Sequence, residues 1–367
     1  MQNPFKPTAG KNPPALIGRD PVIDEFVEGI ENGSGAPGRL MRITGMRGMG
    51  KTVMLNEIGR RAKELGWLVI DETASEGFCE RILAAAAPKE RVTSVTAGPS
   101  ILGVSLGSIE IDRAALSLRD TLRAAAEKGG TGLLITLDEV QDASLNEMRA
   151  LSVAIQHEIR DDADIAFVFA GLPSMIESVV NGKTLTFLRR AVPVDLGPVS
   201  VAEVALSLRK TMRESGLEID GDVADLLAEA TRGYPFMIQL VGYHAWQVAH
   251  RSGLGRVDEE AARQGVLLAR ERFDRTVIEP ALQRLPATLI EYLLAMAEDH
   301  GFPSETGEVA SRMGKSAQQV STYRARLIRE DVIEASSWGK VSFAIPYMDE
   351  YLNARRSELE AEAGLVE

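Results

Sequence analysis

The sequence predicts an α/β fold in which a mostly parallel sheet is followed by an all-α domain and a winged helix-turn-helix domain. Over the first half of the chain, short apolar segments alternate with amphipathic segments of helical length. This alternation is typical of βαβ units, in which helices cover both faces of a parallel sheet. From residue 200 the strands stop and amphipathic helices follow, and two short strands come only near the end of the chain.

Length and composition indicate a globular protein of two or three domains. The chain has 367 residues, of which 45% are hydrophobic and 26% are charged. Its net charge of −12 excludes a general polyanion-binding surface, so any contact with nucleic acid has to be local. The single cysteine, Cys79, excludes an internal disulfide and a cysteine-rich zinc site, and we expect it to be a small apolar residue on a helix.

We expect neither a secretion signal nor a membrane span. The N-terminus lacks a basic region followed by an apolar stretch. The longest apolar segment, 165–173, is shorter than the ~18 residues that a membrane-spanning helix needs. The sequence therefore predicts a cytoplasmic protein without a membrane partner.

The N-terminal residues 1–14 are rich in proline and lysine and are expected to run extended over the surface. The α/β core is expected at 15–199, and its first helix begins at a turn with Asp20 as N-cap and Pro21 as first residue. Strands are predicted at 40–44, 67–70, 132–137, 165–170 and 192–194. Further helices are predicted at 51–65, 77–87, 114–127 and 145–160, with a hairpin-like insertion at 91–112.

Two further domains are expected after the core. The all-α domain, 200–285, should contain no strand. Its helices are predicted at 201–215, 222–231, 235–252 and 258–284. The last domain, 286–367, combines helices at 286–299, 306–313 and 316–330 with strands at 332–335 and 341–346. Three helices followed by two strands are the pattern of a winged helix-turn-helix.

One glycine-rich turn carries the chemistry. It matches the pattern G-x-x-x-x-G-K-[ST] at every constrained position, with Gly45, Met46, Arg47, Gly48, Met49, Gly50, Lys51 and Thr52. The glycines let successive backbone N–H groups face phosphate oxygens, and the following helix adds its positive N-terminal dipole. Lys51 would reach the β- and γ-phosphates, and the Thr52 hydroxyl would bind Mg²⁺. A chance glycine-rich turn, the alternative, does not explain the strand before it and the helix after it.

Two carboxylates follow the apolar strand at 132–137. A central strand that is buried on both faces ends in acids where a cation lies at its tip. We expect Asp138 to hold Mg²⁺ through water, and Glu139 to orient and deprotonate the attacking water. The alternative is a polar strand end that simply enters a loop.

Three further candidates are weaker. Ser174 follows the strand at 165–170, which should lie beside the acidic strand, and would occupy the place of a γ-phosphate sensor. Arg190, next to Arg189, is either an arginine finger or an ordinary surface arginine. The turn 232–235 either closes over a nucleotide or only joins two helices. No carboxylate or cysteine lies at metal-ligand spacing from the histidines His157, His244, His250 and His300.

The motifs occur in an order that resembles the AAA+ P-loop ATPases of the Orc1/Cdc6-like and archaeal-ATPase group, close to the STAND ATPases. The resemblance rests on Ile17-Gly18-Arg19 before a helix, the glycine-rich loop, the run 137–141, the turn 232–235 and the terminal winged helix. It extends over most of the chain, from about residue 15 to about residue 350.

The resemblance implies that ATP with Mg²⁺ binds between the α/β core and the all-α domain, which would act as a lid. The implied nucleotide-binding residues are Ile17, Gly18 and Arg19 on the adenine side, the loop from Gly45 to Thr52, Val53 and Pro235. The implied catalytic residues are Lys51, Glu139 and Arg190, and the implied Mg²⁺ ligands are Thr52 and Asp138. An ATP-dependent oligomer is a further expectation. Ser174 departs from the family pattern, which indicates slow hydrolysis.

The winged helix has two open interpretations. Arg324, Arg326, Arg329 and Lys340 would contact DNA phosphates. However, residues 287–355 contain seven Lys and Arg against ten Asp and Glu, a net charge of −3, whereas DNA-binding domains are usually basic. A protein-binding or autoinhibitory module is therefore the alternative to DNA binding.

Together these features predict an ATPase that acts as a nucleotide-dependent switch and controls the winged-helix module. The alternative function is a slowly hydrolysing, nucleotide-bound scaffold that binds proteins and not DNA. A small-molecule kinase would use the same loop, but it would not require the last domain.

Overall fold

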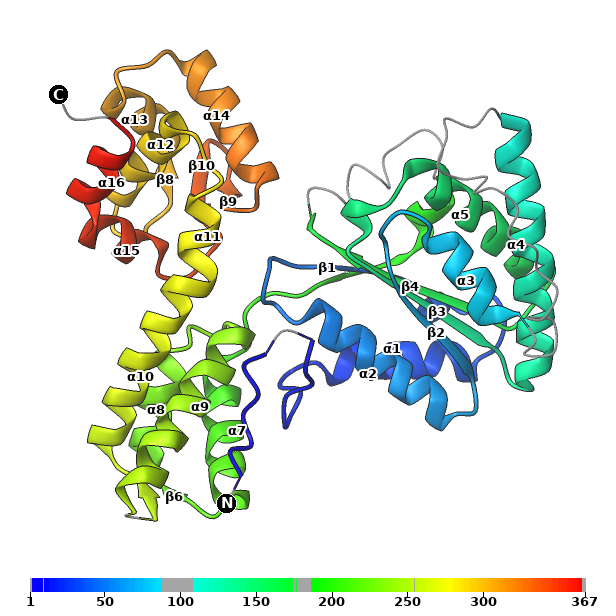
Figure 1. Cartoon of the computed structure of the whole chain (residues 1–367), viewed down its shortest axis with the longest axis horizontal. Helices are drawn as coiled ribbons and strands as arrows, with labels where there is room; N and C mark the ends of the chain where they lie inside the picture. Colours follow the sequence, from blue (N-terminus) through cyan, green and yellow to red (C-terminus); the bar gives the residue numbers. More distant parts are fainter. Residues whose placement is uncertain are drawn as a thin grey trace. The chain divides into compact units, whose positions relative to one another are not determined.

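The computed structural model describes residues 2–8, 10–87, 108–173, 176, 186–253 and 255–364. The chain forms two compact units (Figure 1). The α/β unit comprises Gly18–Gly45 and Gly50–Gly197. The helical unit comprises Met1–Ile17, Met46–Met49 and Pro198–Glu367, so it includes the middle of the glycine-rich loop.

A five-stranded parallel sheet forms the centre of the α/β unit, as predicted. Its strands are β1 (Leu40–Thr44), β2 (Leu68–Thr73), β3 (Leu133–Asp138), β4 (Ile165–Gly171) and β5 (Val192–Asp195). The spatial order is β2-β3-β4-β1-β5, and every neighbouring pair is parallel. β4 therefore lies next to the acidic strand β3, which confirms that prediction, and it separates β3 from β1.

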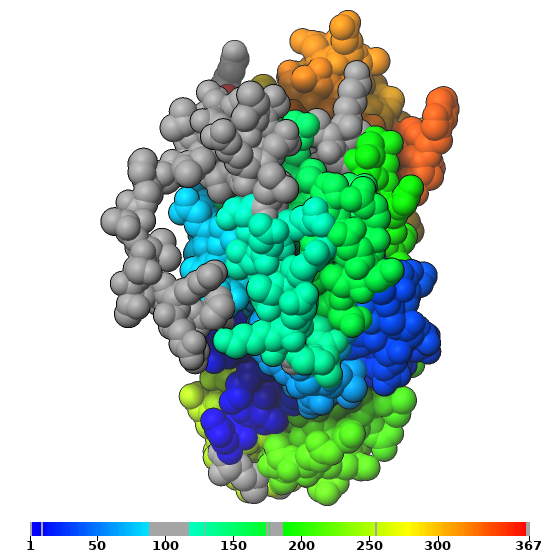
Figure 2. Space-filling view, turned by 90° about the vertical axis from the view of Figure 1, so that its right-hand side faces the viewer, coloured from blue at the N-terminus to red at the C-terminus, as the bar shows by residue number. Residues whose placement is uncertain are grey.

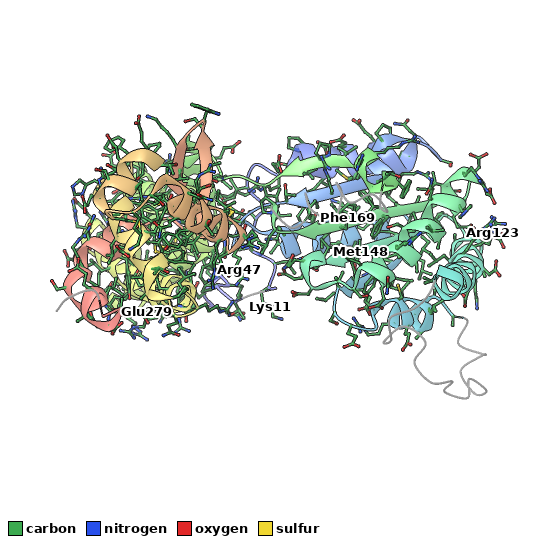
Figure 3. All side chains as sticks on the ribbon, turned by 90° about the horizontal axis from the view of Figure 1, so that it is seen from above. Lys11, Arg47, Arg123, Met148, Phe169 and Glu279 are labelled. Carbon is green, nitrogen blue, oxygen red and sulfur yellow. The ribbon has the colours of Figure 1, made fainter. Side chains whose placement is uncertain are left out.

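Helices α1 and α2 cover one face of the sheet, and α3, α4 and α5 cover the other (Figure 1). Their bounds are α1 (Asp20–Glu31), α2 (Lys51–Glu64), α3 (Phe78–Ala86), α4 (Ser108–Gly129) and α5 (Leu145–Arg160). Because both faces are covered, β3 and β4 are buried along their whole length. Figure 3 shows Phe169 and Met148 inside the unit and Arg123 at its surface, and Figure 2 presents the face on which α4 and α5 lie.

Two predictions for this unit differ from the structure. Arg19 is the N-cap of α1, and Asp20 is its first residue, so the Asp20 side chain does not cap the helix. α4 begins at Ser108, so the end of the predicted insertion at 91–112 is helical, while 91–107 lie outside the described residues. Cys79 is buried on α3, as expected.

The all-α part of the helical unit has four main helices. They are α7 (Val201–Glu214), α8 (Gly221–Glu229), α9 (Pro235–Ser252) and α10 (Glu259–Phe273). The prediction that this part contains no strand is wrong, because β6 (Glu218–Ile219) and β7 (Arg256–Val257) form a short parallel pair. The N-terminal segment is anchored on α9, where the buried ring of Phe5 lies against Gly242. It is therefore not merely extended over the surface.

The predicted helix at 258–284 is confirmed from Glu259 to Leu282, with a π segment inside it. After α10 the chain forms a π turn over Asp274–Ile278 and continues as α11 (Glu279–Leu282). The physical cause is Pro280, which has no N–H to bond the carbonyl of Thr276 and whose ring pushes against that carbonyl.

The last part of the chain is a winged helix, as predicted. Its helices are α12 (Ala287–Ala297), α13 (Thr306–Arg312) and α14 (Ala317–Arg329), and α14 begins with a capping box of Ser316 and Gln319. β8 (Ser304–Glu305), β10 (Lys340–Phe343) and β9 (Ile333–Ser337) form the wing in that spatial order. Two helices that the sequence analysis does not predict follow, α15 (Met348–Ala354) and α16 (Arg356–Glu362).

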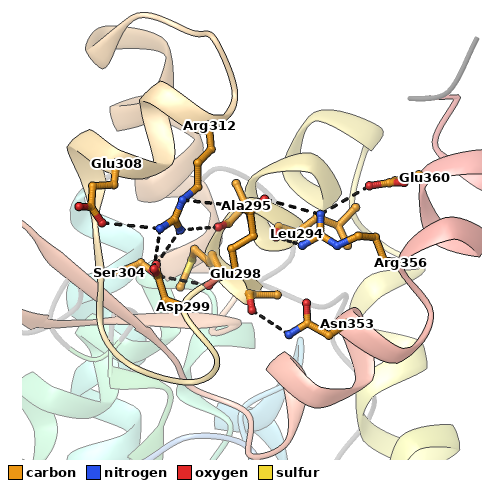
Figure 4. Close-up of polar contacts among 12 residues, drawn as sticks. Leu294, Ala295, Glu298, Asp299, Ser304, Glu308, Arg312, Asn353, Arg356 and Glu360 are labelled. Atoms are coloured by element: carbon orange, nitrogen blue, oxygen red, sulfur yellow. Dashed lines mark hydrogen bonds and ion pairs between the residues drawn. The ribbon is translucent and has the colours of Figure 1, made fainter.

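Ion pairs and backbone contacts fasten the helices of the winged helix together (Figure 4). Arg312 of α13 donates to both carboxylate oxygens of Asp299, at 2.7 and 2.6 Å, and to the carbonyl of Ala295. Arg356 of α16 donates to the carbonyl of Leu294 at 2.7 Å. Charged side chains in this part of the chain therefore stabilise packing between helices.

Candidate functional site

The glycine-rich loop joins β1 to α2. Gly48 and Gly50 have φ values of 81° and 88°, a left-handed conformation that favours glycine. Gly50 is the N-cap of α2, so the first N–H groups of that helix point toward the loop. Lys51 is buried, and its ammonium donates to the carbonyl of Gly45 at 2.8 Å. The loop thus combines backbone donors and a cationic side chain, which suits an anion.

The carboxyl end of β3 lies close to the start of α2. The Thr52 hydroxyl donates to Oδ2 of Asp138 at 2.5 Å, and the Glu139 N–H donates to Oδ1 at 2.9 Å. Burial raises the pKa of Asp138, and these two hydrogen bonds only partly offset it. The structure therefore brings together Lys51, Thr52, Asp138 and Glu139 at one edge of the sheet, although β4 separates their two strands.

Gln141, which is not among the predicted site residues, connects Glu139 to β4. Glu139 has a left-handed φ of 54° and begins the 3-10 turn Val140–Asp142. The Gln141 amide nitrogen donates to the Glu139 carboxylate, and its amide oxygen accepts from the backbone N–H of Leu172 at 3.3 Å. A Cβ on Gly171 would lie 3.0 Å from that amide oxygen. The sequence signal for Gln141 is its place at the end of the run 137–141, which carries the resemblance without indicating this role.

The other predicted site residues lie as follows. Arg19 donates to the carbonyl of Gly197 at 2.6 Å, and Gly18 precedes it with a left-handed φ of 63°. Arg190 is exposed at the end of the turn Thr186–Arg190, just before β5. Val53 is half-buried in the first turn of α2, whereas Ile17 and Pro235 belong to the helical unit. Ser174 lies outside the described residues.

The middle of the glycine-rich loop packs on the turn Thr231–Tyr234, which we call the lid turn. The Tyr234 hydroxyl donates to the carbonyl of Arg47. A Cβ on Gly48 would lie 2.6 Å from the Tyr234 hydroxyl oxygen, so only glycine fits there. Tyr234 is buried, and burial raises the pKa of its phenol.

The predicted DNA-contacting residues lie on α14 and the wing. Arg326 and Arg329 are exposed and form no ion pair within the described part of the chain, and Arg324 is half-buried. Lys340 lies 3.4 Å from Glu305 across β10 and β8. Trp338, at the tip of the wing, is fully exposed.

No group of three or more His, Cys, Asp or Glu residues in the described ranges is arranged to hold a metal ion by itself. Any metal site at the end of β3 therefore needs ligands of another kind, such as a hydroxyl, water or phosphate. In the same ranges, no helix is long and apolar enough to cross a membrane.

Comparison with known families identifies the first domain. Residues 15–168 match the AAA ATPase domain family, and residues 275–352 match a domain of unknown function, DUF8462. No curated protein sequence matches the chain.

Solved structures resemble the chain over nearly its full length. The Walker-type ATPase PABY2304 of Pyrococcus abyssi is 16% identical with a TM-score of 0.63, over 92% of this chain and 96% of that one. The ORC2 protein of Aeropyrum pernix, in ADPNP–ADP complexes, is 16% identical with a TM-score of 0.65, over 98% of both chains. The Cdc6p protein of Pyrobaculum aerophilum is 16% identical with a TM-score of 0.54, over 97% of both chains.

The fold and the family match define a P-loop protein with an AAA ATPase domain, which implies nucleotide binding. More particularly, the chain has the Orc/Cdc6 fold, with a five-stranded α/β core, a helical region and a C-terminal winged helix. The predicted resemblance is thus confirmed.

Proposed function

We propose that this protein is an ATP-dependent switch, in which nucleotide bound at the glycine-rich loop controls the winged-helix module. The observation that carries the proposal is the convergence of Lys51, Thr52, Asp138 and Glu139 at one edge of the sheet. The ORC2 structure that this fold resembles was determined with ADPNP and ADP, which supports a nucleotide as the ligand.

The loop and the start of α2 would bind the phosphates of ATP. Their backbone N–H groups have no helical acceptor and carry the positive end of the helix dipole. Lys51, which bonds the Gly45 carbonyl here, would move its ammonium to the β- and γ-phosphates. Ile17, Gly18 and Arg19 would line the adenine side, and the turn that ends at Pro235 would report the nucleotide state.

The residues at the end of β3 fit Mg²⁺. Thr52 and Asp138 offer oxygen atoms, the ligands that this ion prefers, and the rest of its shell would come from phosphate and water. Asp138 is buried, and burial raises its pKa, so an arriving cation would relieve an unfavourable carboxylate. The ion would neutralise negative charge on the phosphates.

Glu139 would act on the attacking water. Its carboxylate takes a proton while the water oxygen forms a bond to the γ-phosphorus, and the bond between that phosphorus and the β–γ bridging oxygen breaks. The bridging oxygen leaves with the electron pair, so the products are ADP and phosphate. Arg190 is exposed, and we assign it the role of an arginine finger toward a neighbouring copy in an ATP-dependent oligomer.

The test of nucleotide binding is a lysine substitution with a matched control on the same helix. We expect Lys51→Ala to abolish ATP binding measured by calorimetry on the full chain, because the loop loses its only ammonium. Lys63→Ala removes an exposed lysine that pairs with Asp71 at 3.3 Å, and it should bind ATP like the unchanged protein. Equal ATP affinity of Lys51→Ala and the unchanged protein would refute the proposal.

DNA is the target of the winged helix that we favour, because Arg326 and Arg329 are exposed on α14 without an ion pair within the described chain. The net charge of −3 over residues 287–355 favours the second candidate, a nucleotide-bound protein scaffold. Electrophoretic shifts of duplex DNA at several salt concentrations, with and without ATP, separate the two. DNA binding that weakens with salt supports the first, and no shift at low salt supports the second.

A further inference from the structure

The lid turn is fixed on the side that faces the glycine-rich loop. The Tyr234 hydroxyl donates a hydrogen bond to the Arg47 carbonyl. Gly48 lies so close to the tyrosine ring that a Cβ at this position would overlap it. In a trans peptide the N–H points away from the preceding carbonyl. Tyr234 therefore fixes the direction of the Gly48 N–H, which is one of the loop donors available to phosphate.

The lid turn is also fixed to the winged helix, through four side chains. The guanidinium of Arg232 lies 3.9 Å from the centre of the Tyr347 ring, and that of Arg270 lies 3.4 Å from it. Glu350 of α15 accepts from Arg232 at 2.5 Å and from Arg270 at 2.9 Å. The Tyr347 hydroxyl donates to the carbonyl of Ala230 at 2.6 Å. We call Arg232, Arg270, Tyr347 and Glu350 the latch.

The backbone between these two attachments has little freedom. Arg232 and Gly233 have left-handed φ values of 49° and 70°. A Cβ on Gly233 would lie 2.1 Å from the carbonyl oxygen of Val199, whose N–H donates to the Gly233 carbonyl at 2.8 Å. Because the backbone of this turn is constrained, it cannot bend when Tyr234 moves. A movement of Tyr234 is therefore transmitted to Arg232, two residues away.

A pocket beside the loop leaves room for such a displacement. It has a volume of about 260 Å³ and lies wholly within the helical unit. Its walls are the loop residues Met46, Arg47 and Gly48, Tyr234, part of the π turn and α11, and residues of the winged helix after α14. The loop, the lid turn and the winged helix therefore meet around one space.

We propose that Tyr234 is a positioning residue for the glycine-rich loop, and that the lid turn couples this loop to the latch on the winged helix. The coupling rests on the proposed function, because it requires a nucleotide at the loop. The latch keeps the turn in place, and the turn presents the Gly48 N–H in a fixed direction. Phosphate binding at the loop therefore stabilises the contacts of the latch, and the latch contacts increase the affinity of the loop for phosphate. Thermodynamic coupling of this kind is equal in both directions.

The experiment is a double-mutant cycle on the full chain. Tyr234→Phe removes only the hydroxyl, and Glu350→Gln removes the carboxylate charge from the latch. The control is Glu291→Gln, which makes the same charge change elsewhere in the winged helix, where Glu291 pairs with Lys315 at 2.7 Å. The dissociation constant of ATP is measured for each variant by calorimetry, and circular dichroism checks that each variant is folded.

We expect Tyr234→Phe to weaken ATP binding by about tenfold, since one oriented donor of the loop is released. Glu350→Gln should weaken it by about threefold, and Glu291→Gln should leave it unchanged. The double variant Tyr234→Phe/Glu350→Gln should bind like Tyr234→Phe alone, because the latch acts through the hydroxyl. In hydrogen exchange, ATP should slow exchange over α15 in the unchanged protein and not in Tyr234→Phe.

Either of two results would overturn the coupling: equal ATP affinities of the Glu350→Gln and Glu291→Gln variants, or losses that add in the double variant. Both results leave the proposed function standing, provided that the unchanged protein binds ATP and Lys51→Ala does not. If the unchanged protein binds no ATP, it is the proposed function that fails.

Discussion

Two aspartates, one in each unit, differ in how their charge is balanced. Asp138, at the end of β3, is buried and accepts hydrogen bonds from a hydroxyl and a backbone N–H, and burial raises its pKa. Asp299, in the winged helix, receives two hydrogen bonds from the Arg312 guanidinium, which lowers its pKa (Figure 4). The Asp138 carboxylate accepts hydrogen bonds from neutral groups, whereas the Asp299 carboxylate is paired with the positively charged guanidinium of Arg312.

This difference distinguishes an acid that is suited to bind a cation from an acid that stabilises the fold. A carboxylate held by neutral donors in a buried place costs free energy in the protein alone, and that cost is offset when a cation binds. A carboxylate paired with arginine stabilises the fold and has little capacity for another ligand. Substitutions at the end of β3 should therefore change turnover, and substitutions around Arg312 should change stability.

The largest effect is expected from Glu139→Gln. The amide keeps the shape of the side chain and cannot take a proton from the attacking water. We expect the turnover number for ATP to fall by about 10²- to 10⁴-fold, while ATP affinity stays within about threefold and the free energy of unfolding within about 0.5 kcal/mol. Steady-state phosphate release and calorimetry measure the two functional quantities. Undiminished hydrolysis would remove Glu139 from the catalytic role.

A smaller effect on the same reaction is expected from Gln141→Leu. The leucine keeps the size of the side chain and loses both hydrogen bonds, to Glu139 and to the N–H of Leu172. The carboxylate is then misplaced, so turnover should fall by about tenfold to a hundredfold with little change in ATP affinity.

Two companion variants sharpen this prediction. Asp142→Asn changes an exposed acid of the same 3-10 turn and should leave turnover unchanged. Gly171→Ala places a Cβ 2.8 Å from Val140 and 3.0 Å from the Gln141 amide oxygen, so it should slow turnover as Gln141→Leu does. If Gln141→Leu behaves like Asp142→Asn, Gln141 does not position Glu139.

The sequence predicts those parts of the fold and site that are local in the chain. The loop 45–52 and the run ending in Asp138 and Glu139 each combine a periodic strand with adjacent polar residues, so spacing alone indicates their structure. The meeting of the strand ends also follows, because parallel strands joined by helices place their carboxyl ends at one edge. Of the strand order, only the position of β4 beside β3 is predicted.

Contacts between distant residues are not visible in such patterns. The latch joins Arg232 to Glu350, and the loop contact joins Arg47 to Tyr234, through side chains more than a hundred residues apart. The π turn before Pro280 is a different case, because its signal is present in the sequence, where a proline inside a predicted helix indicates a distortion. The strands β6 and β7 have two residues each, too few to show any period.

Glu147 is a third acid, and like Asp138 it is held by neutral donors. Its donors, however, are the first N–H groups of helix α3, where a carboxylate is favoured by the positive end of the helix dipole, so we expect Glu147 to serve folding. It is buried in α5, and its two carboxylate oxygens accept from the N–H groups of Gly77 and Cys79 at the start of α3, at 3.2 and 3.1 Å. Glu147→Ala leaves these donors without an acceptor, so the free energy of unfolding should fall by about 1–2 kcal/mol. Urea unfolding measures it.

The matched control for this variant is Glu80→Gln, which changes an exposed acid in the first turn of α3 and should have an effect below about 0.5 kcal/mol. Turnover per folded molecule should be unaffected in both variants. A fall in turnover with unchanged stability in Glu147→Ala would contradict the division between the two kinds of acid.

The smallest effect is expected from Asp299→Asn, and it depends on pH. Because Arg312 lowers the pKa of Asp299 in the folded protein, the unfolded chain binds the proton more readily. The stability that this pair contributes is complete well above pH 4, and it is lost as the pH falls from about 4 through the lowered pKa. Asp299→Asn should therefore cost about 1 kcal/mol at neutral pH and less at pH 2, since its unfolding curve lacks this acid-dependent step. Glu305→Gln, which breaks only the exposed pair with Lys340, should match the unchanged protein at both pH values. An equal difference between Asp299→Asn and the unchanged protein at both pH values would show that the packing of this residue, and not its charge, stabilises the winged helix.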